Sequence, residues 1–179
     1  MKTVSLETAK ALKEAGWKQY QSSAYWIIKG ARVEDGYNKW SEENIECDEL
    51  VVIGEAIIEE GNVGFSNAPD NQHRTFPAIG IGEYGDDNYI HIPIEDICAA
   101  PTADEILDEL PGYLYNDFDS LMWLDIRKND NGYLVHYYDA EYGKSGFIAG
   151  EKIYFEEETL ADAAAQMWIY IKENNLLTP

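Results

Sequence analysis

Two stretches of this sequence match the letters of motifs that bind or activate substrates in other proteins. Residues 80–85 fit GxGxxG, which binds a pyrophosphate where the motif opens a helix. Two aspartates and an asparagine follow at 86–88. They repel phosphate and disfavour a helix, so we interpret 80–85 as a glycine-rich turn. Residues 64–68 approximate the GxSxG serine elbow, but Pro69 follows where that motif needs a helix. The sequence therefore predicts neither a dinucleotide site nor a serine nucleophile.

The other residues capable of catalysis or metal binding are not spaced as they are in catalytic or metal-binding motifs. His73, His91 and His136 lie in separate segments without HxH or HxxxH spacing, so a metal site would have to be assembled through space. Acidic pairs are too numerous to nominate one general acid or base. Cys47 and Cys98 are 51 positions apart and form no CxxC pair, which argues against a disulfide and fits a reducing compartment. We predict no catalytic residue, no cofactor and no metal ligand.

Negative charge is the most unusual property of the chain, whose formal net charge is −21 over 179 residues. Residues 34–110 contain twenty acidic and two basic residues, whereas residues 1–33 contain two acidic and six basic residues. Such a surface repels nucleic acid and attracts basic proteins, over a Debye length of about 8 Å at physiological salt. The alternative is that the excess charge only keeps the protein soluble.

The acidic middle of the chain is where we expect a binding function. It combines turns and glycines with carboxylates that few basic residues neutralise. Binding residues often lie on loops that a rigid frame holds in place. The candidate partner-binding residues are Glu42, Glu43, Glu46, Asp48, Glu49, Asp86 and Asp87.

Aromatic residues cluster in the C-terminal third. In a strand over 133–138, the odd-numbered positions point to one face, and Leu134, His136 and Tyr138 point to the other. Because tyrosine and tryptophan bind well at protein interfaces, one of these sets is a candidate contact surface. The alternative is that a helix over 160–174 covers one set and the chain termini cover the other. The clustered aromatic residues are Trp123, Tyr133, Tyr137, Tyr138 and Tyr142.

Helix signals mark both ends of the chain. Ser5 can cap a helix that runs to Ala15, and Gly16 occupies the position of a left-handed helix stop. Thr102 and Glu105 form a capping box, in which each side chain accepts a hydrogen bond from the other's backbone amide, and so start a second helix. The other predicted elements are a strand over 24–28, strands over 121–126 and 133–138 joined by a hairpin, a strand over 152–155, and a helix that Thr159 caps and that ends at 174–175.

The middle of the chain is less regular. Residues 49–59 fit a strand pair or a short helix, because so short an apolar run shows no clear period. Residues 61–74 are polar and rich in turn residues, which predicts a long loop. Residues 89–94 predict a strand that Pro93 places at a sheet edge or a strand end.

Helices around hairpin-type strands predict an α+β fold, with helices packed on a mainly antiparallel sheet. We expect a single domain over residues 1–179. Within it, residues 1–33 and 100–179 form a scaffold around the acidic, loop-rich middle at 34–99.

No segment of the sequence predicts membrane contact. The longest aliphatic run, at 50–53, is far shorter than the roughly 18 residues of a membrane span. The start of the chain has Lys2 but no apolar stretch of the kind that a secretory signal needs. We therefore expect a cytoplasmic protein.

Three segments, at 5–17, 100–107 and 160–177, together resemble uncharacterised small proteins of bacteriophages and prophages of gut bacteria. Those proteins share the order of an opening helix, a capped helix that begins with Ala-Pro-Thr, a hairpin and a closing helix. The resemblance covers roughly the first 30 and the last 80 residues. The family has no established activity, so the resemblance implies a phage or prophage origin and assigns no functional residue.

These observations together favour a non-enzymatic protein-interaction protein, of the inhibitor or decoy kind, that binds a basic host protein. The sequence leaves open the oligomeric state. The alternative is a domain that binds a small ligand, or a small enzyme, with a site assembled only in three dimensions.

Overall fold

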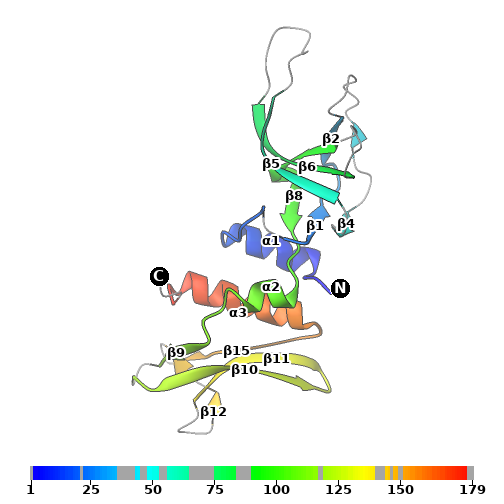
Figure 1. The fold of residues 1–179 in the computed structure, drawn as a ribbon. Helices are drawn as coiled ribbons and strands as arrows, with labels where there is room; N and C mark the ends of the chain where they lie inside the picture. Colours follow the sequence, from blue (N-terminus) through cyan, green and yellow to red (C-terminus); the bar gives the residue numbers. More distant parts are fainter. Residues whose placement is uncertain are drawn as a thin grey trace. The chain divides into compact units, whose positions relative to one another are not determined.

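The computed structural model of the chain contains α-helices and antiparallel sheets, which confirms the predicted α+β class (Figure 1). The chain divides into two compact units. We call Met1–Trp17 with Pro101–Pro179 the helix–sheet unit, and Lys18–Ala100 the strand unit. The residues that the structure describes are 2–20, 22–35, 43–44, 48–52, 56–64, 75–83, 90–116, 119–139, 144–145, 147–148 and 151–176.

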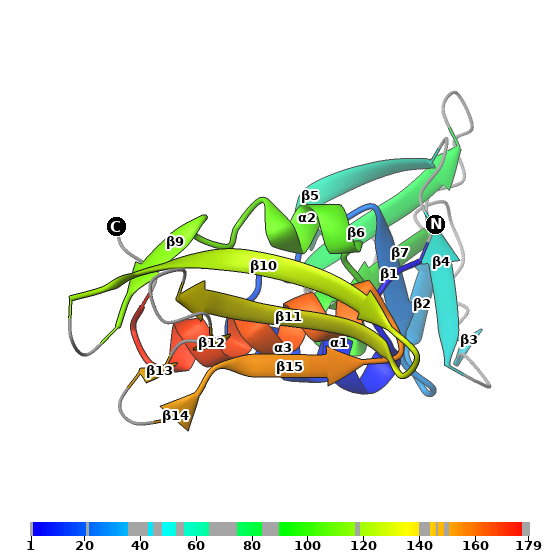
Figure 2. The ribbon, with the colours of Figure 1, turned by 90° about the horizontal axis from the view of Figure 1, so that it is seen from below.

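The helix–sheet unit packs helices against one face of a five-stranded antiparallel sheet. α3 (Leu160–Glu173) contacts α1 (Leu6–Glu14) on one side and the sheet strands β11 (Gly132–Asp139) and β15 (Tyr154–Glu157) on the other (Figures 1 and 2). The strand order is β12-β11-β10-β9, and β15 also pairs with β11. The elements are α1 (Leu6–Glu14), α2 (Ala103–Leu107), β9 (Tyr113–Tyr115), β10 (Leu121–Asn129), β11 (Gly132–Asp139), β12 (Lys144–Ser145), β15 (Tyr154–Glu157) and α3 (Leu160–Glu173), with a separate pair of β13 (Phe147–Ile148) and β14 (Glu151–Lys152).

The strand unit contains two antiparallel sheets among its described residues, one with the order β4-β1-β8 and one with the order β3-β2-β7-β6-β5. Residues 18–33, which we expected in the terminal scaffold, belong to this unit. Its elements are β1 (Ala24–Ile27), β2 (Arg32–Asp35), β3 (Glu43–Asn44), β4 (Glu49–Val52), β5 (Ala56–Gly64), β6 (Thr75–Glu83), β7 (Ile90–Pro93), the 3-10 turn η1 (Ile94–Asp96) and β8 (Ile97–Ala99).

Local hydrogen bonds define both ends of α1, as the sequence predicts. The Ser5 hydroxyl accepts a hydrogen bond from the Thr8 amide at the start of the helix. At the other end, Gly16 has a φ of +90°, and the Trp17 amide donates to the Leu12 carbonyl over 2.8 Å. This is the Schellman arrangement, which needs a residue that tolerates the left-handed conformation.

The other two helices begin where their caps predict. Thr102 and Glu105 form the expected capping box, but α2 stops at Leu107. The chain then continues in 3-10 turns that still bury Leu110, so the predicted apolar stripe is kept in a shorter helix. α3 begins after Thr159 and ends in a second Schellman arrangement at 174–176.

The middle of the chain has more strand than its sequence predicts. Residues 61–64, expected in a loop, complete β5, and residues 80–83, expected in a turn, belong to β6. Residues 49–59 contain two strands, β4 and β5, which lie in different sheets. The long pairing of β5 with β6 explains why the sequence predicted a loop and a turn here. Backbone pairing between the two strands keeps their glycine-rich segments extended, although these segments lack the alternating side-chain pattern of a strand. No helix in the described part of the chain is long and apolar enough to cross a membrane.

Asp162 joins the start of α1 to the start of α3. Its carboxylate accepts hydrogen bonds from the Ser5 amide over 2.9 Å and from the Thr159 hydroxyl over 2.6 Å. Burial acts to raise the pKa of Asp162, but the hydrogen bonds from Thr159, Ser5 and Thr8 outweigh it and hold the pKa below its usual range. The ionised carboxylate is therefore the form that stabilises the fold.

We expect Asp162→Asn to lower the free energy of unfolding by about 1 to 2 kcal/mol at pH 7, because a charged acceptor shared by two caps is lost. The lowered pKa sets the pH dependence. The contribution of Asp162 is complete above the unfolded pKa of about 3.9 and disappears as the pH falls through the lower folded value. Urea unfolding of both proteins between pH 7 and pH 3 measures the difference, which should shrink on acidification. A difference that stays constant over this range would contradict the role of the ionised carboxylate.

Candidate functional site

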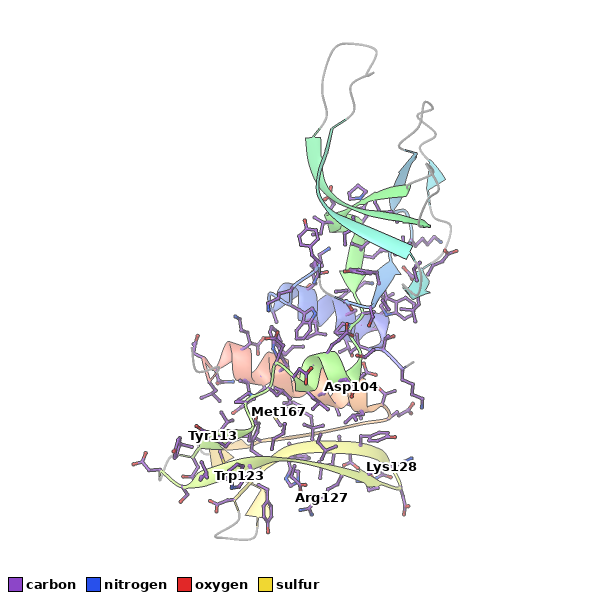
Figure 3. The ribbon with its side chains drawn as sticks, viewed as in Figure 1. Asp104, Tyr113, Trp123, Arg127, Lys128 and Met167 are labelled. Carbon is purple, nitrogen blue, oxygen red and sulfur yellow. The ribbon has the colours of Figure 1, made fainter. Side chains whose placement is uncertain are left out.

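The five-stranded sheet has an inner face that packs on α3 and an outer face that points away from it. Met167 of α3 lies between the helix and the sheet, whereas Trp123 and Arg127 lie on the other side of the sheet (Figure 3). The closing helix therefore covers one face of β11, as one of the two alternatives for the aromatic residues expected, and the covered face is the odd-numbered one, which the sequence had left open. The buried side chains of the inner face are Leu114, Met122, Val135 and Tyr137.

Strand register arranges the outer face in two rows. Trp123 is paired with Tyr113 on β9 and with Tyr138 on β11, so three rings from three strands form one row. Neighbouring strands lie about 4.8 Å apart, which brings such cross-strand side chains into contact. The second row consists of Asp125, His136 and Tyr154.

Tyr113, Tyr115 and Trp123 form what we call the aromatic cluster. The ring centroids of Tyr113 and Tyr115 are 6.0 Å apart with 85° between their planes, and those of Tyr113 and Trp123 are 5.9 Å apart with 62° between theirs. Each edge-to-face contact of this kind contributes about 0.5 to 1.5 kcal/mol to stability. The three residues are nevertheless 51%, 61% and 50% exposed. The aromatic cluster is thus a large apolar surface that folding leaves in water.

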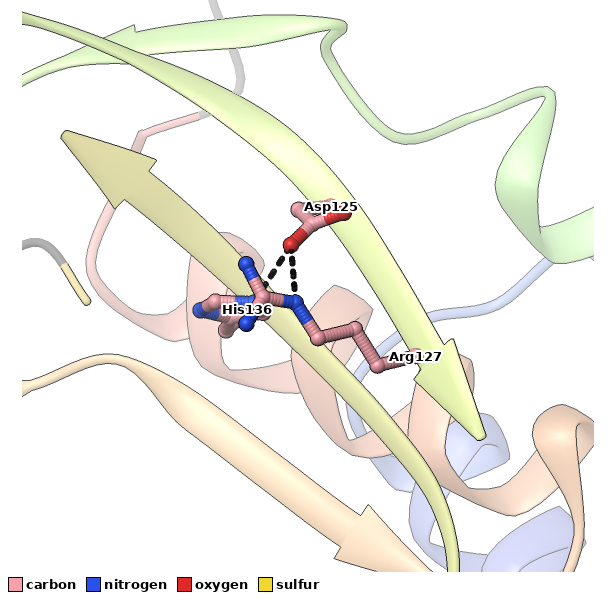
Figure 4. Close-up of polar contacts among 3 residues, drawn as sticks. All are labelled: Asp125, Arg127 and His136. Atoms are coloured by element: carbon pink, nitrogen blue, oxygen red, sulfur yellow. Dashed lines mark hydrogen bonds and ion pairs between the residues drawn. The ribbon is translucent and has the colours of Figure 1, made fainter. Parts of the chain in front are cut away.

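A polar group that includes Asp125 and His136 of the second row lies beside the row of rings. Arg127 Nε donates to Asp125 Oδ2 over 2.7 Å, and His136 Nε2 lies 2.9 Å from the same oxygen (Figure 4). The slight burial of Asp125 acts to raise its pKa, but the hydrogen bonds and charges of Arg127 and His136 outweigh this and lower the pKa. Asp125 is therefore held as an anion.

The Asp125–His136 pair has the composition of an acid–base dyad, but its position does not suit catalysis. The side chain of His136 is only 3% exposed, so a substrate in solution does not reach its ring nitrogens. Its ring instead packs against Tyr138, with centroids 6.1 Å apart. We conclude that this pair holds β10 and β11 together beneath the exposed rings.

Most of the acidic residues proposed to bind a partner fall outside the described residues. Asp48 and Glu49 are exposed. Asp48 also accepts a hydrogen bond from the Lys29 amide over 2.8 Å, so it has a structural role in the strand unit. Glu43 belongs to β3, where the structure describes the backbone. The candidates that lie outside the described residues are Glu42, Glu46, Asp86 and Asp87.

The described residues contain no group of three or more histidine, cysteine, aspartate or glutamate side chains that could hold a metal ion. His73 lies outside this part of the chain, and His91 belongs to β7 with its side chain not described. Cys98 is buried in β8. Cys47 also lies outside the described residues, so the expected absence of a disulfide between the two cysteines stays a prediction.

The net negative charge is distributed differently between the two units than along the sequence. The strand unit has sixteen acidic and five basic residues, and the helix–sheet unit has eighteen acidic and eight basic residues. The net charges are thus −11 and −10. Although the acidic residues are concentrated in the middle of the sequence, the net negative charge is almost equal in the two units, so both units attract a basic molecule.

Sequence reasoning found part of the aromatic outer face and missed the rest. Trp123 and Tyr138 were among the clustered aromatic residues, but Tyr113 and Tyr115 were not assigned to a strand. The alternation of Tyr113, Leu114 and Tyr115 after a Pro-Gly stop is the signal that could have identified β9. Tyr142 lies outside the described residues.

Comparisons of this chain with protein-family models, with curated proteins and with solved structures give no match. The chemistry of the outer face and the net charge of each unit are the observations from which a function can be proposed.

Proposed function

We propose that this chain is a non-enzymatic protein-binding protein and that the aromatic cluster contacts its partner. One observation carries the proposal: three large rings stay half exposed on one face of a sheet whose other face packs on α3. Monomeric proteins rarely expose contiguous apolar surface unless it serves an interaction. Tyrosine and tryptophan are also enriched among the residues that contribute most binding energy at interfaces.

The charge favours a basic partner. Each unit carries about ten net negative charges, which attract basic proteins and repel nucleic acid. We propose a basic host protein as the partner, with no nucleic acid or membrane involved. The resemblance of the terminal segments supports a phage or prophage origin and a role as an inhibitor or decoy in the cytoplasm.

The acidic residues of the middle segment act at longer range in this proposal. Charges that remain solvated speed association more than they strengthen the final complex. Asp48→Asn is a suitable change, because the amide oxygen can still accept the hydrogen bond from Lys29. The residues to neutralise with Gln or Asn are Glu42, Glu43, Glu46, Asp48 and Glu49.

We expect Trp123→Ala to weaken partner binding by about thirty-fold or more, the effect of removing a central aromatic residue from an interface. The full chain would be immobilised, exposed to a bacterial lysate, and its bound proteins quantified by mass spectrometry. The affinity of the enriched protein would then be measured with the purified partner. Folding should be nearly unaffected, since Trp123 is half exposed.

Leu50→Ala is the matched control, because Leu50 is a large apolar side chain of the strand unit that is 39% exposed. It should capture the same partner as the unchanged chain. The variant neutralised at the five acidic positions should associate more slowly at low salt. If Trp123→Ala and Leu50→Ala retain the same proteins in the same amounts, the aromatic cluster is not the contact surface and the proposal is wrong.

A further inference from the structure

Two tyrosine rings of the five-stranded sheet each lie against a cationic side chain of the same protein. Arg127 Cζ lies 5.6 Å from the ring centroid of Tyr138 on the outer face. Lys128 Nζ lies 5.4 Å from the ring centroid of Tyr133, directly across the strand pair. Both distances are within the range at which an aromatic face attracts a cation.

The aromatic cluster differs from these rings. Tyr113, Tyr115 and Trp123 lie on the same face as Tyr138, but within the described residues no lysine or arginine is placed over their rings. Their exposed halves leave ring surface open to an incoming group. An aromatic face next to a strongly acidic surface attracts positive charge more than an isolated ring does.

We propose that the aromatic cluster binds the lysine or arginine side chains of a basic peptide segment, through cation–π contacts with Trp123 and Tyr113. This inference rests on the proposed function and names the chemistry of its contact. Charge complementarity supports it, because the helix–sheet unit has a net charge of −10. Arg127 and Lys128 on the same sheet show the contact in intramolecular form.

Other occupants fit less well. A second copy of this chain would bring together two molecules of charge −21, which repel each other. A nucleic acid would be repelled by the net charge of −10 that the helix–sheet unit carries. A single cationic side chain needs only one open ring face.

The test uses two peptides of equal length, acetylated Gly-Arg-Gly-Arg-Gly and its counterpart with citrulline in place of arginine. Citrulline keeps the planar side chain and removes the charge. The full chain would be titrated with each peptide while the tryptophan indole N–H resonances are followed by NMR. The Trp123 resonance would be assigned by its loss in Trp123→Leu, and Leu50→Ala would serve as the control.

We expect the arginine peptide to bind and to shift the Trp123 resonance, and the citrulline peptide to do neither. Trp123→Leu and Tyr113→Leu, which keep apolar bulk and remove the ring, should weaken binding of the arginine peptide by about five-fold to thirty-fold. Raising the salt concentration should weaken binding to the unchanged and variant chains in the same proportion, because it screens only the long-range attraction.

Equal binding of the arginine peptide to the unchanged chain and to Trp123→Leu would overturn the inference, since acidity alone would then explain the binding. A concentration-dependent dimer that Trp123→Leu abolishes would overturn it in favour of a second copy. Failure of the proposed function is distinguishable. If Trp123→Ala loses the lysate partner while Trp123→Leu keeps it, the cluster docks a protein by apolar burial, and only the cation inference is wrong.

Discussion

Replacing Gly132 by alanine is expected to lower the free energy of unfolding by about 3 to 5 kcal/mol. Gly132 begins β11 with a φ of +141°, a conformation that costs other residues about 1 to 3 kcal/mol. A Cβ atom at this position would also overlap the carbonyl group of Glu157 on β15, which is backbone and cannot turn aside. Overpacking of this kind adds a further 1 to 3 kcal/mol or so.

Two other glycines of the same unit separate these causes. Gly16 has a φ of +90° and open space where a Cβ atom would lie, and Gly112 has the same open space without a positive φ. Alanine at Gly16 should therefore cost about 1 kcal/mol, and alanine at Gly112 close to nothing. Thermal and urea unfolding followed by circular dichroism would measure all three variants. If Gly132→Ala is no less stable than Gly16→Ala, then β15 does not pass as close to the hairpin as the structure places it.

Met167→Ala should destabilise the helix–sheet unit by about 2 to 5 kcal/mol. Met167 is fully buried on the inner side of α3, between the helix and the sheet (Figure 3). Removing a buried side chain loses its transfer free energy and leaves a cavity that neighbours fill only in part. Alanine favours helix formation, so the loss cannot be attributed to the helix itself.

Gln166→Ala is the control within the same helix, because Gln166 is adjacent and only half-buried. We expect it to change the free energy of unfolding by no more than about 0.5 kcal/mol. Urea unfolding of the two variants in parallel would give the comparison. Equal effects would mean that α3 does not pack on the sheet through Met167. Neither variant alters the outer face, so partner binding at a temperature well below unfolding should persist in both.

Helix ends are the part of this fold that the sequence predicts best. Ser5, Thr102 and Thr159 each accept a hydrogen bond from an amide three residues ahead, so the signal is complete within a few residues. The hairpin is local in the same way. Asn129 Oδ1 accepts hydrogen bonds from the Asn131 and Gly132 amides, and the turn forms where it is expected.

The strands of the middle segment were harder to predict, because their stability comes from partners that are distant in sequence. Residues 80–83 contain two glycines and read as a turn, yet their backbone pairs with residues 56–59 on one side and, in part, with β7 on the other. Backbone pairing does not depend on a side-chain pattern, so no local sequence pattern predicts it.

The α+β class, the caps, the hairpin and the acidic charge are predictable from the linear chain, because each depends on composition or on contacts over a few residues. Alternation along the strand at 133–138 also divided its side chains into two sets, but did not indicate which set would stay exposed. Both faces contain aromatic residues, so hydrophobicity could not separate them. Packing of α3 on the inner face leaves the other face exposed, and pairing of β9 with β10 brings Tyr113 and Tyr115 beside Trp123 on that exposed face. The candidate site therefore depends on strand register and on the packing of α3, which a linear pattern does not contain.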